Sequence, residues 1–523
     1  MLLRPARRLL LSLALLAAPP LWADTPLLWF DADRPTAQAQ QAVKILAAAG
    51  EDGLEPRDYQ AAALGRGVAR ALREPPLTEA AQAQLDTALT TALQRFLADR
   101  QAGRVDPRQI HARFAVQRPA PLDTATLVHT AVTDQRLAEA VREAVPRLPM
   151  YAGLRRALAR YRTLADHPAW QAAPPALPPG RKLREGQAWA GLPVLAQRLA
   201  ALGDLPADTP VPPRLEGELL AALQTFQERH GLTPDGVLGA ATLAALNVTP
   251  AARVRQIELT LERLRWTPYL QAPRMIVVNV PEFMLRAYEV REGQVQVRLA
   301  MKVIVGKALD TRTPLFDEDM RFIEFSPYWN VPPSIARQEL VPRLRRQPGY
   351  FAQQGFEFVG PGGQVVTTLS AAQLDAVLAG GWRIRQRPGP QNALGDIKFV
   401  FPNNDNIYLH HTPTPQLFQR DRRDFSHGCI RVEEPVALAQ FVLRDEPTWT
   451  EERIRAAMAQ GRSSTLRLKQ PLPVLIAYST VVVKGEQVFF YPDLYGHDQL
   501  LDQALRRYSA NLPAPGLPDS EAK

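Results

Sequence analysis

The chain has 523 residues, more than one hydrophobic core usually supports, so we expect two to four domains. Hydrophobic residues make up 46% and charged residues 22% of it, a globular composition that excludes a chain disordered throughout. The net charge is +9, but no basic cluster is interleaved with aromatic residues, so we expect no nucleic-acid partner.

Residues 1–23 have the pattern of a secretory signal peptide. Arg4, Arg7 and Arg8 precede an apolar run at 9–18, and Ala23 is a small residue suited to cleavage. The run is shorter than the ~20 residues of a membrane-spanning helix. We predict export with removal of this segment; an uncleaved inner-membrane anchor is the alternative. The rest of the sequence has no stretch of membrane-spanning length, so we expect no obligatory membrane span.

Residues 24–180 are predicted to form a helical scaffold followed by a linker. Apolar residues recur at helical spacing in 35–49, 78–102 and 151–165. The segment 167–180, HPAWQAAPPALPPG, is rich in Pro and is predicted to be stiff and extended rather than helical.

Residues 181–252 are predicted to form a compact helical module. In FQERHGLTPDGVLGAATLAALN, residues 226–247, apolar side chains are spaced as packing positions and TPDG forms a turn between helices. The order FQ, GL, DG, G and TL resembles that of three-helix peptidoglycan-binding modules. The alternative is an ordinary helical hairpin.

Residues 253–470 change to the pattern of a mostly β domain, which gives the whole chain a multidomain α+β class. Short runs rich in Val, Ile and aromatic residues predict antiparallel strands, and a helical stretch at 332–383 is interpreted as an insertion between them. Residues 471–523 are expected to add strands and a disordered tail from 514. The predicted strands are 274–280, 283–289, 295–305, 322–325, 395–401, 407–410, 472–478 and 481–490, and the predicted helices of this region include 253–266 and 449–460.

The single cysteine, Cys429, is the candidate nucleophile. It cannot form an internal disulfide, and a free thiol is only a few per cent ionised at neutral pH, so a nearby imidazole is needed to take its proton. Gly428 lies in a tight turn whose backbone N–H groups can stabilise an oxyanion. Ser426 and Arg431 are candidates for orienting the histidine or for binding a substrate carboxylate, which an arginine can do through two N–H groups.

Two histidines compete for the role of general base. His427 lies two residues before Cys429, so in an extended segment both side chains share one face. His410 ends a predicted strand and reaches the cysteine only through the fold. The spacing alone favours His427.

The segment 407–435 resembles the signature of L,D-transpeptidase catalytic domains, a histidine at a strand end followed by S-H-G-C-[IL]-R-[VL]. The resemblance implies that Cys429 is the nucleophile, His410 the base and His427 a supporting residue. His411 is a departure, because Asp is expected there. The matching residues are His410, Ser426, His427, Gly428, Cys429, Ile430, Arg431 and Val432.

ERLRW at 262–266, WNVPPSI at 329–335, QNALGDIKFVFPN at 391–403 and YLHHTP at 408–413 resemble segments of the long Gram-negative members of this family. Those members have a helical scaffold, a peptidoglycan-binding module and a lid, here 332–383. The resemblance implies a periplasmic enzyme without metal or cofactor. Its partners would be peptidoglycan stem peptides and other cell-wall enzymes.

The resemblance also implies a two-step acyl transfer. Cys429 would form a thioester with a donor tetrapeptide, release D-Ala, and pass the acyl group to an acceptor amine to give a third-to-third cross-link. Carbapenems acylate such enzymes, and the lid would shield the thioester from water.

Three alternatives remain open from the sequence. The same cysteine chemistry can attach a lipoprotein to peptidoglycan or release it. His410, His427 and Cys429 could instead ligate zinc, although the spacing lacks the usual Cys pairs or HExxH helix. A wall-binding protein with an inert thiol is the non-enzymatic alternative.

Overall fold

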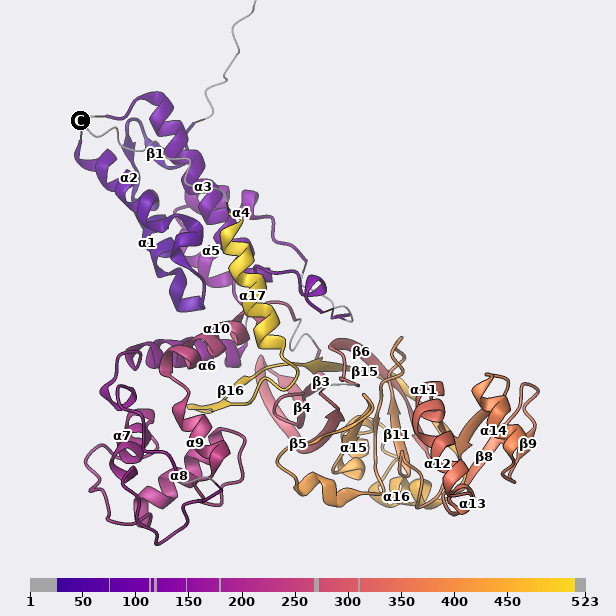
Figure 1. The fold of residues 1–523 in the computed structure, drawn as a ribbon. Helices are drawn as coiled ribbons and strands as arrows, with labels where there is room; N and C mark the ends of the chain where they lie inside the picture. The colour runs from indigo at the N-terminus through magenta and orange to yellow at the C-terminus, as the bar shows by residue number, and fades with distance from the viewer. Residues whose placement is uncertain are drawn as a thin grey trace, which may run out of the picture.

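The computed structural model describes residues 26–512 except 75, 112–113, 117–119, 147, 178–179, 268–271 and 309–310. The predicted signal peptide and the tail from 514 therefore lie outside the described residues. Four large hydrophobic cores organise the described residues, one each for the N-terminal helices, the middle helical module, a β domain and an insertion in that domain. Figure 1 shows how these parts follow one another along the chain. The predicted α+β class is confirmed. Within the described ranges, no helix has the length and apolar character needed to cross a bilayer.

The N-terminal helices pack around their own core, as the apolar spacing predicts. Side-chain oxygens of Thr36 and Thr78 accept the N–H groups of Ala39 and Ala81, so two of the helices begin at capping threonines. The elements are β1 (Phe30–Asp31), β2 (Arg34–Pro35), α1 (Ala37–Ala47), η1 (Ala48–Asp52), η2 (Pro56–Tyr59), α2 (Ala61–Arg73), α3 (Glu79–Ala102), η3 (Pro107–Gln109), α4 (Thr124–Thr133) and α5 (Leu137–Glu143).

A second core joins the middle module to the helices that precede and follow it. Helix α6, which was expected to belong to the scaffold, packs here against α10. The predicted extended linker begins with a 3-10 turn, because Arg198 donates to the carbonyl oxygens of Ala169 and Ala172 at 3.0 Å each. The elements are α6 (Pro149–Thr163), η4 (Pro168–Trp170), α7 (Leu192–Leu202), α8 (Gly217–Arg229), α9 (Ala240–Asn247) and α10 (Pro250–Leu264).

The β domain is built on one nine-stranded sheet in the order β13-β5-β14-β12-β11-β6-β15-β3-β4. Because β4 also pairs with β5, the sheet closes on itself around the third core. We expected antiparallel pairing, but three of the strand pairs are parallel: β12–β14, β15–β3 and β13–β5. The elements are β3 (Arg274–Asn279), β4 (Met284–Arg291), β5 (Gln294–Gly306), β6 (Phe316–Phe325), β11 (Ile397–Val400), β12 (Leu409–His410), η6 (Pro415–Gln419), β13 (Asp424–Ser426), β14 (Ile430–Val432), α15 (Pro435–Val442), α16 (Glu451–Ala459) and β15 (Ser464–Ala477).

The insertion between β6 and β11, called the lid below, has a core of its own. The prediction of a helical insertion at 332–383 is incomplete, because a four-stranded sheet of order β7-β10-β8-β9 forms part of it. Its strands are short, so their sequences carry little period-two signal. The elements are β7 (Trp329–Asn330), α11 (Pro333–Ile335), the π-helical turn η5 (Ala336–Leu340), α12 (Val341–Arg346), α13 (Gly349–Gln353), β8 (Phe356–Val359), β9 (Val365–Val366), α14 (Ala371–Leu378) and β10 (Arg383–Gln386).

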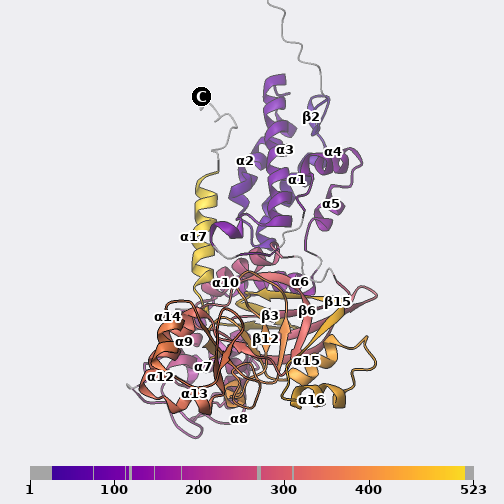
Figure 2. The ribbon, with the colours of Figure 1, turned by 90° about the vertical axis from the view of Figure 1, so that its right-hand side faces the viewer.

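The C-terminal segment returns to the first two parts of the chain. Strands β16 (Val481–Lys484) and β17 (Gln487–Phe490) form a hairpin that enters the second core. The expectation of strands and a tail for 471–523 is wrong beyond the hairpin, because α17 (His497–Ala510) is a helix. It runs alongside the N-terminal helices in both views (Figures 1 and 2). Tyr508 and Ser509 donate to Asp99 and Asp58 at 2.7 and 2.8 Å.

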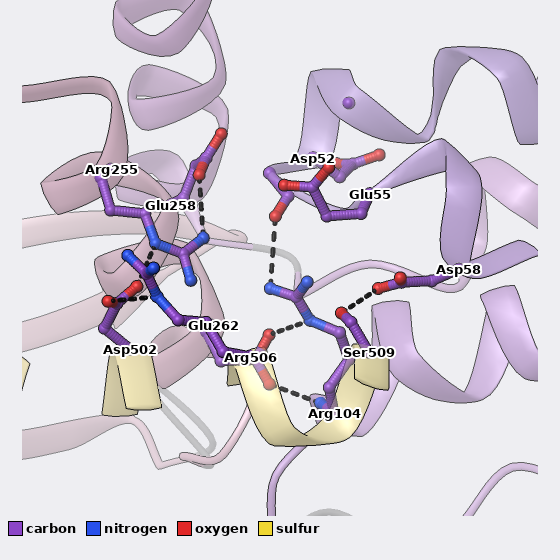
Figure 3. A network of polar contacts seen from close by, with 12 residues as sticks. Asp52, Glu55, Asp58, Arg104, Arg255, Glu258, Glu262, Asp502, Arg506 and Ser509 are labelled. Atoms are coloured by element: carbon purple, nitrogen blue, oxygen red, sulfur yellow. Dashed lines mark hydrogen bonds and ion pairs between the residues drawn. The ribbon is translucent and has the colours of Figure 1, made fainter. Parts of the chain in front are cut away.

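A buried ion cluster lies where the N-terminal helices, α6 and α10 meet. The fully buried carboxylate of Glu262 binds Arg104 at 3.1 Å and Arg265 at 2.9 Å. Arg265 also donates to the Tyr151 hydroxyl at 2.9 Å. Figure 3 shows how Asp502 and Ser509 of α17 add contacts to Arg255 and Asp58 beside this cluster. The ERLRW segment is thus a domain junction.

We expect Glu262→Gln to lower the free energy of unfolding by about 3–5 kcal/mol, because two buried arginines would lose their counter-charge. The two arginines hold the pKa of Glu262 below its ordinary value of 4.5, although burial, the largest influence, opposes them. Its stabilising charge is therefore lost as the pH falls below about 4.5, and the difference between variant and wild type should shrink there. Urea unfolding followed by tryptophan fluorescence measures both effects. Glu451→Gln, which breaks an exposed pair with Arg455, is the control and should change little.

Candidate active site

Three of the candidate residues, Cys429, His410 and Arg431, lie on one face of two neighbouring parallel strands. In the β12–β14 pairing, Leu409 is level with Ile430 and His410 with Arg431. Leu409 and Ile430 are fully buried in the core of the β domain. Because side chains alternate along a strand, His410 and Arg431 point to the opposite face, and Cys429 shares that face one step back.

The Cys429 thiol is enclosed by the segment just before β12. Its Sγ donates to the carbonyl oxygen of Asn406 at 3.7 Å. Burial raises the pKa of Cys429, while hydrogen bonds from the backbone and side chain of Tyr408 act in the opposite direction. Burial, followed by the nearby Cys429, raises the pKa of Tyr408 well above its ordinary value. The thiol is therefore protonated at neutral pH in this state.

The turn that carries Cys429 is fixed by hydroxyl groups. Ser426 Oγ accepts the N–H of Gly428 at 3.1 Å and donates to the carbonyl of Cys429. Thr313 Oγ1 donates to the carbonyl of Gly428 at 2.7 Å. Gly428 has φ +115°, which an L side chain rarely adopts, so glycine is required here. Its N–H, predicted to face an oxyanion, is bonded to Ser426 in this state.

His410 is buried near Cys429, the candidate nucleophile. Its Nδ1 lies 2.5 Å from the carbonyl oxygen of His411, which can only accept, so Nδ1 carries the proton and Nε2 is the basic nitrogen. Burial first, and the charge of Arg431 second, lower the pKa of His410 to about 3. No hydrogen bond joins it to Cys429 among the described contacts. The imidazole is neutral, as a base must be before reaction.

His427 contacts the lid, and no hydrogen bond to Cys429 is found among its described contacts. Its Nε2 lies 2.6 Å from Oε1 of Glu339, on the π-helical turn η5. The sequence spacing favours His427 as the general base, but its described contacts do not include Cys429 and so do not support that role. Glu339 was missed because it is distant in sequence.

Cationic side chains flank the thiol on the same face. Lys398 pairs with Glu324 at 3.1 Å and its Nζ lies 4.3 Å from the centre of the Tyr408 ring. Arg431 donates to Thr414 Oγ1 at 3.4 Å, and its buried Nε has no hydrogen-bond partner. Both charges act to lower the pKa of Cys429, so they favour the thiolate once it forms.

Two further segments highlighted by the sequence hold the site in place. His411, found where Asp was expected, pairs with Asp396 at 2.7 Å. The side chain of Asn403 bonds both backbone groups of Ile407, which fixes the loop that presents Asn406 to the thiol. Sequence reasoning did not identify Tyr408 and Asn406 as neighbours of the thiol. The one feature that could have pointed to them is their position just before His410.

The geometry does not favour the zinc alternative. Over the ranges that the structure describes, no three His, Cys, Asp or Glu side chains come together in a way that could hold a metal ion. His410 bonds a backbone carbonyl, and His427 bonds the lid.

Comparison with protein families divides the chain into three matched regions. Residues 273–462 match the L,D-transpeptidase catalytic domain, residues 23–158 a scaffold domain, and residues 183–246 the "Putative peptidoglycan binding domain". The catalytic match contains Cys429, His410 and the lid.

A curated protein of Haemophilus influenzae named "Putative L,D-transpeptidase" is 31% identical over 250 residues, 48% of this chain. The match spans 49% of that protein, about half its length. The crystal structure of an L,D-transpeptidase from Xylanimonas cellulosilytica is matched over 58% of this chain and all of that chain at 16% identity. Its TM-score is 0.17, so nothing about the fold is taken from it.

The matched regions follow one another in the order scaffold, peptidoglycan binding and catalysis, and the catalytic one holds the cysteine turn described above. A protein built from these domains acts at the cell envelope. The chain is thus similar, region by region, to a scaffold domain, a putative peptidoglycan binding domain and an L,D-transpeptidase catalytic domain, and the last of these contains Cys429 and His410.

Proposed function

We propose that this chain forms third-to-third cross-links between peptidoglycan stem peptides through a thioester on Cys429. The observation that supports it most is the placement of Cys429 and His410 on one face of β12 and β14, beside two cations. We place the enzyme in the periplasm, with stem peptides as substrates and other cell-wall enzymes as partners.

In the first step, Nε2 of His410 takes the thiol proton and Sγ of Cys429 attacks the carbonyl carbon between residues three and four of the donor. The tetrahedral oxyanion collapses, the C–N bond to D-Ala breaks, and the imidazolium returns its proton to the leaving amine. A thioester and free D-Ala result, and the imidazole is neutral again. His410 and Cys429 share no hydrogen bond among the described contacts, so in this scheme substrate binding or a bridging water connects them for proton transfer.

Arg431 links substrate binding to proton transfer in this scheme. Its charge lowers the pKa of His410, which weakens the imidazole as a base. A donor carboxylate bound to Arg431 would offset that charge and restore basicity when substrate is present. Its unpartnered Nε is suited to such a ligand.

In the second step, the amine of an acceptor stem peptide attacks the thioester. The amine proton passes to His410, the C–S bond breaks, and the thiolate of Cys429 is released. The lid limits competition from water. Attachment of a lipoprotein to peptidoglycan, or its release, uses the same chemistry and is the second candidate.

With a disaccharide-tetrapeptide, we expect a mass increase equal to one acyl group on the wild-type protein, and a cross-linked dimer in solution. A carbapenem should give a separate stable adduct. Cys429→Ala should give neither product. Intact-protein mass spectrometry and muropeptide analysis measure these outcomes. Adducts without a dimer would instead favour the lipoprotein reaction.

We expect His410→Gln to lower the rate of acyl-enzyme formation about 10²–10⁴-fold, the usual contribution of a general base. His427→Gln should retain much more of this rate, because His427 contacts Glu339 and not the thiol. Single-turnover mass spectrometry compares the two variants. The reverse order would assign the base to His427.

We expect alkylation of Cys429 by iodoacetamide to accelerate with pH without a plateau below about pH 9. Its pKa is raised above the ordinary value of 9.0, so the reactive thiolate becomes abundant only above that pH. Rates measured between pH 6 and 10 test this. A plateau near neutrality would indicate a preformed thiolate–imidazolium pair and contradict the neutral resting state.

A further inference from the structure

The lid meets the candidate site through one carboxylate. Glu339 lies on η5, and its Oε1 is 2.6 Å from Nε2 of His427, two residues before the nucleophile. Oε2 of Glu339 has no hydrogen-bond partner among the described contacts. The pair therefore leaves half of the carboxylate available beside the thiol-bearing turn.

The backbone holds Glu339 in this position. Ala336 and Leu340, at the ends of η5, are buried in the core of the lid, so the turn is anchored on both sides of the glutamate. A π-helical turn is rare and occurs often at functional sites, because its geometry is less favourable than that of an α-helix. The turn directs one side chain toward the catalytic domain.

The contact between His427 and Glu339 contributes little to stability, so another charged group can replace His427. The side chains of His427 and Glu339 remain 31% and 53% exposed. Exposed ion pairs contribute only about 0–1 kcal/mol. A charged ligand can therefore replace His427 on Glu339 at little cost in stability.

The positive charges around Cys429 disfavour the approach of a cationic acceptor, and a carboxylate such as Glu339 would counteract this repulsion. Lys398 and Arg431 favour the thiolate, but they repel a cation that approaches the thioester. An acceptor amine is an ammonium ion at neutral pH. Glu324, the carboxylate on the same face, is already paired with Lys398 at 3.1 Å.

We propose that Glu339 positions the acceptor by binding its ammonium group, with His427 as the partner that it exchanges. This inference rests on the proposed transpeptidation and names the residue that selects an amine over water in its second step. Glu339 is a positioning residue. The bound ammonium loses one proton to solvent water, the amine nitrogen attacks the thioester carbon and passes its second proton to neutral His410, and the C–S bond breaks. Cys429 is released as thiolate and takes the proton back from the His410 imidazolium.

The test compares a charged with an uncharged acceptor on the same acyl-enzyme. Full-length wild type and Glu339→Gln are acylated with the tetrapeptide, and the acyl-enzyme is quantified by mass spectrometry. We expect the variant to form about three- to fivefold less dimer per acyl-enzyme, the effect of one lost exposed charged contact. Its reaction with hydroxylamine, uncharged at neutral pH, should change less than about twofold.

Two further variants distinguish a role of Glu339 in binding the acceptor from a role in holding the lid against the catalytic domain. His427→Gln removes the competing partner and should keep or raise dimer yield per acyl-enzyme. Asp375→Asn breaks an exposed pair with Arg345 elsewhere on the lid and should leave the yield unchanged. If Glu339→Gln and His427→Gln lose dimer equally, or if hydroxylamine and stem-peptide reactions fall together, Glu339 only holds the lid and the inference is wrong. Absence of acyl-enzyme in the wild type would instead overturn the proposed function.

Discussion

The candidate active site depends on the register of two short parallel strands. Pairing of His410 with Arg431, and of Leu409 with Ile430, decides which side chains face the core and which face the substrate side. A slip of one residue in β12 would turn His410 toward the core and Leu409 away from it. A slip in β14 would do the same to Arg431 and Ile430. The buried pair Leu409 and Ile430 opposes that slip, because exposing each would cost roughly 1.5–3 kcal/mol.

The surrounding fold supports this register from several sides. Closure of the sheet through β4 and β5 leaves β12 and β14 with neighbours on both edges. Ser426 and Thr313 fix the turn before Cys429, and Asn403 fixes the loop before Tyr408. The nucleophile is thus held between two immobilised connections. Precision at the site comes from hydrogen-bonded loops on a rigid sheet.

The sequence was sufficient for features that leave a local pattern. Helices α1 and α3, the three helices of the middle module, and most strands of the β domain follow from periodicity and breaks. Helix α17 also carries such a pattern, since Leu501, Ala504 and Leu505 are buried at helical spacing, but no helix was predicted there.

Features formed by distant segments could not be predicted in the same way. The small lid sheet pairs strands of two to four residues, too short to show alternation. Spacing alone favoured His427 as the base, whereas in the fold the His427 side chain contacts Glu339, which is 88 positions away in the sequence. The roles of Cys429, His410, Ser426, Gly428 and Arg431 remain predictions, now with defined neighbours.

The return of the C-terminal hairpin and α17 to the earlier domains has a consequence for biosynthesis. Contacts such as Arg229 with Val488 and Asp58 with Ser509 join residues separated by 259 and 451 positions. The segment that completes the junction is thus synthesised after the domains that it connects. Until it arrives, the second core lacks Val481, Val488 and Phe490 and exposes apolar surface. Folding of the assembled enzyme is therefore post-translational, and chains shortened before residue 481 would be prone to aggregation and proteolysis.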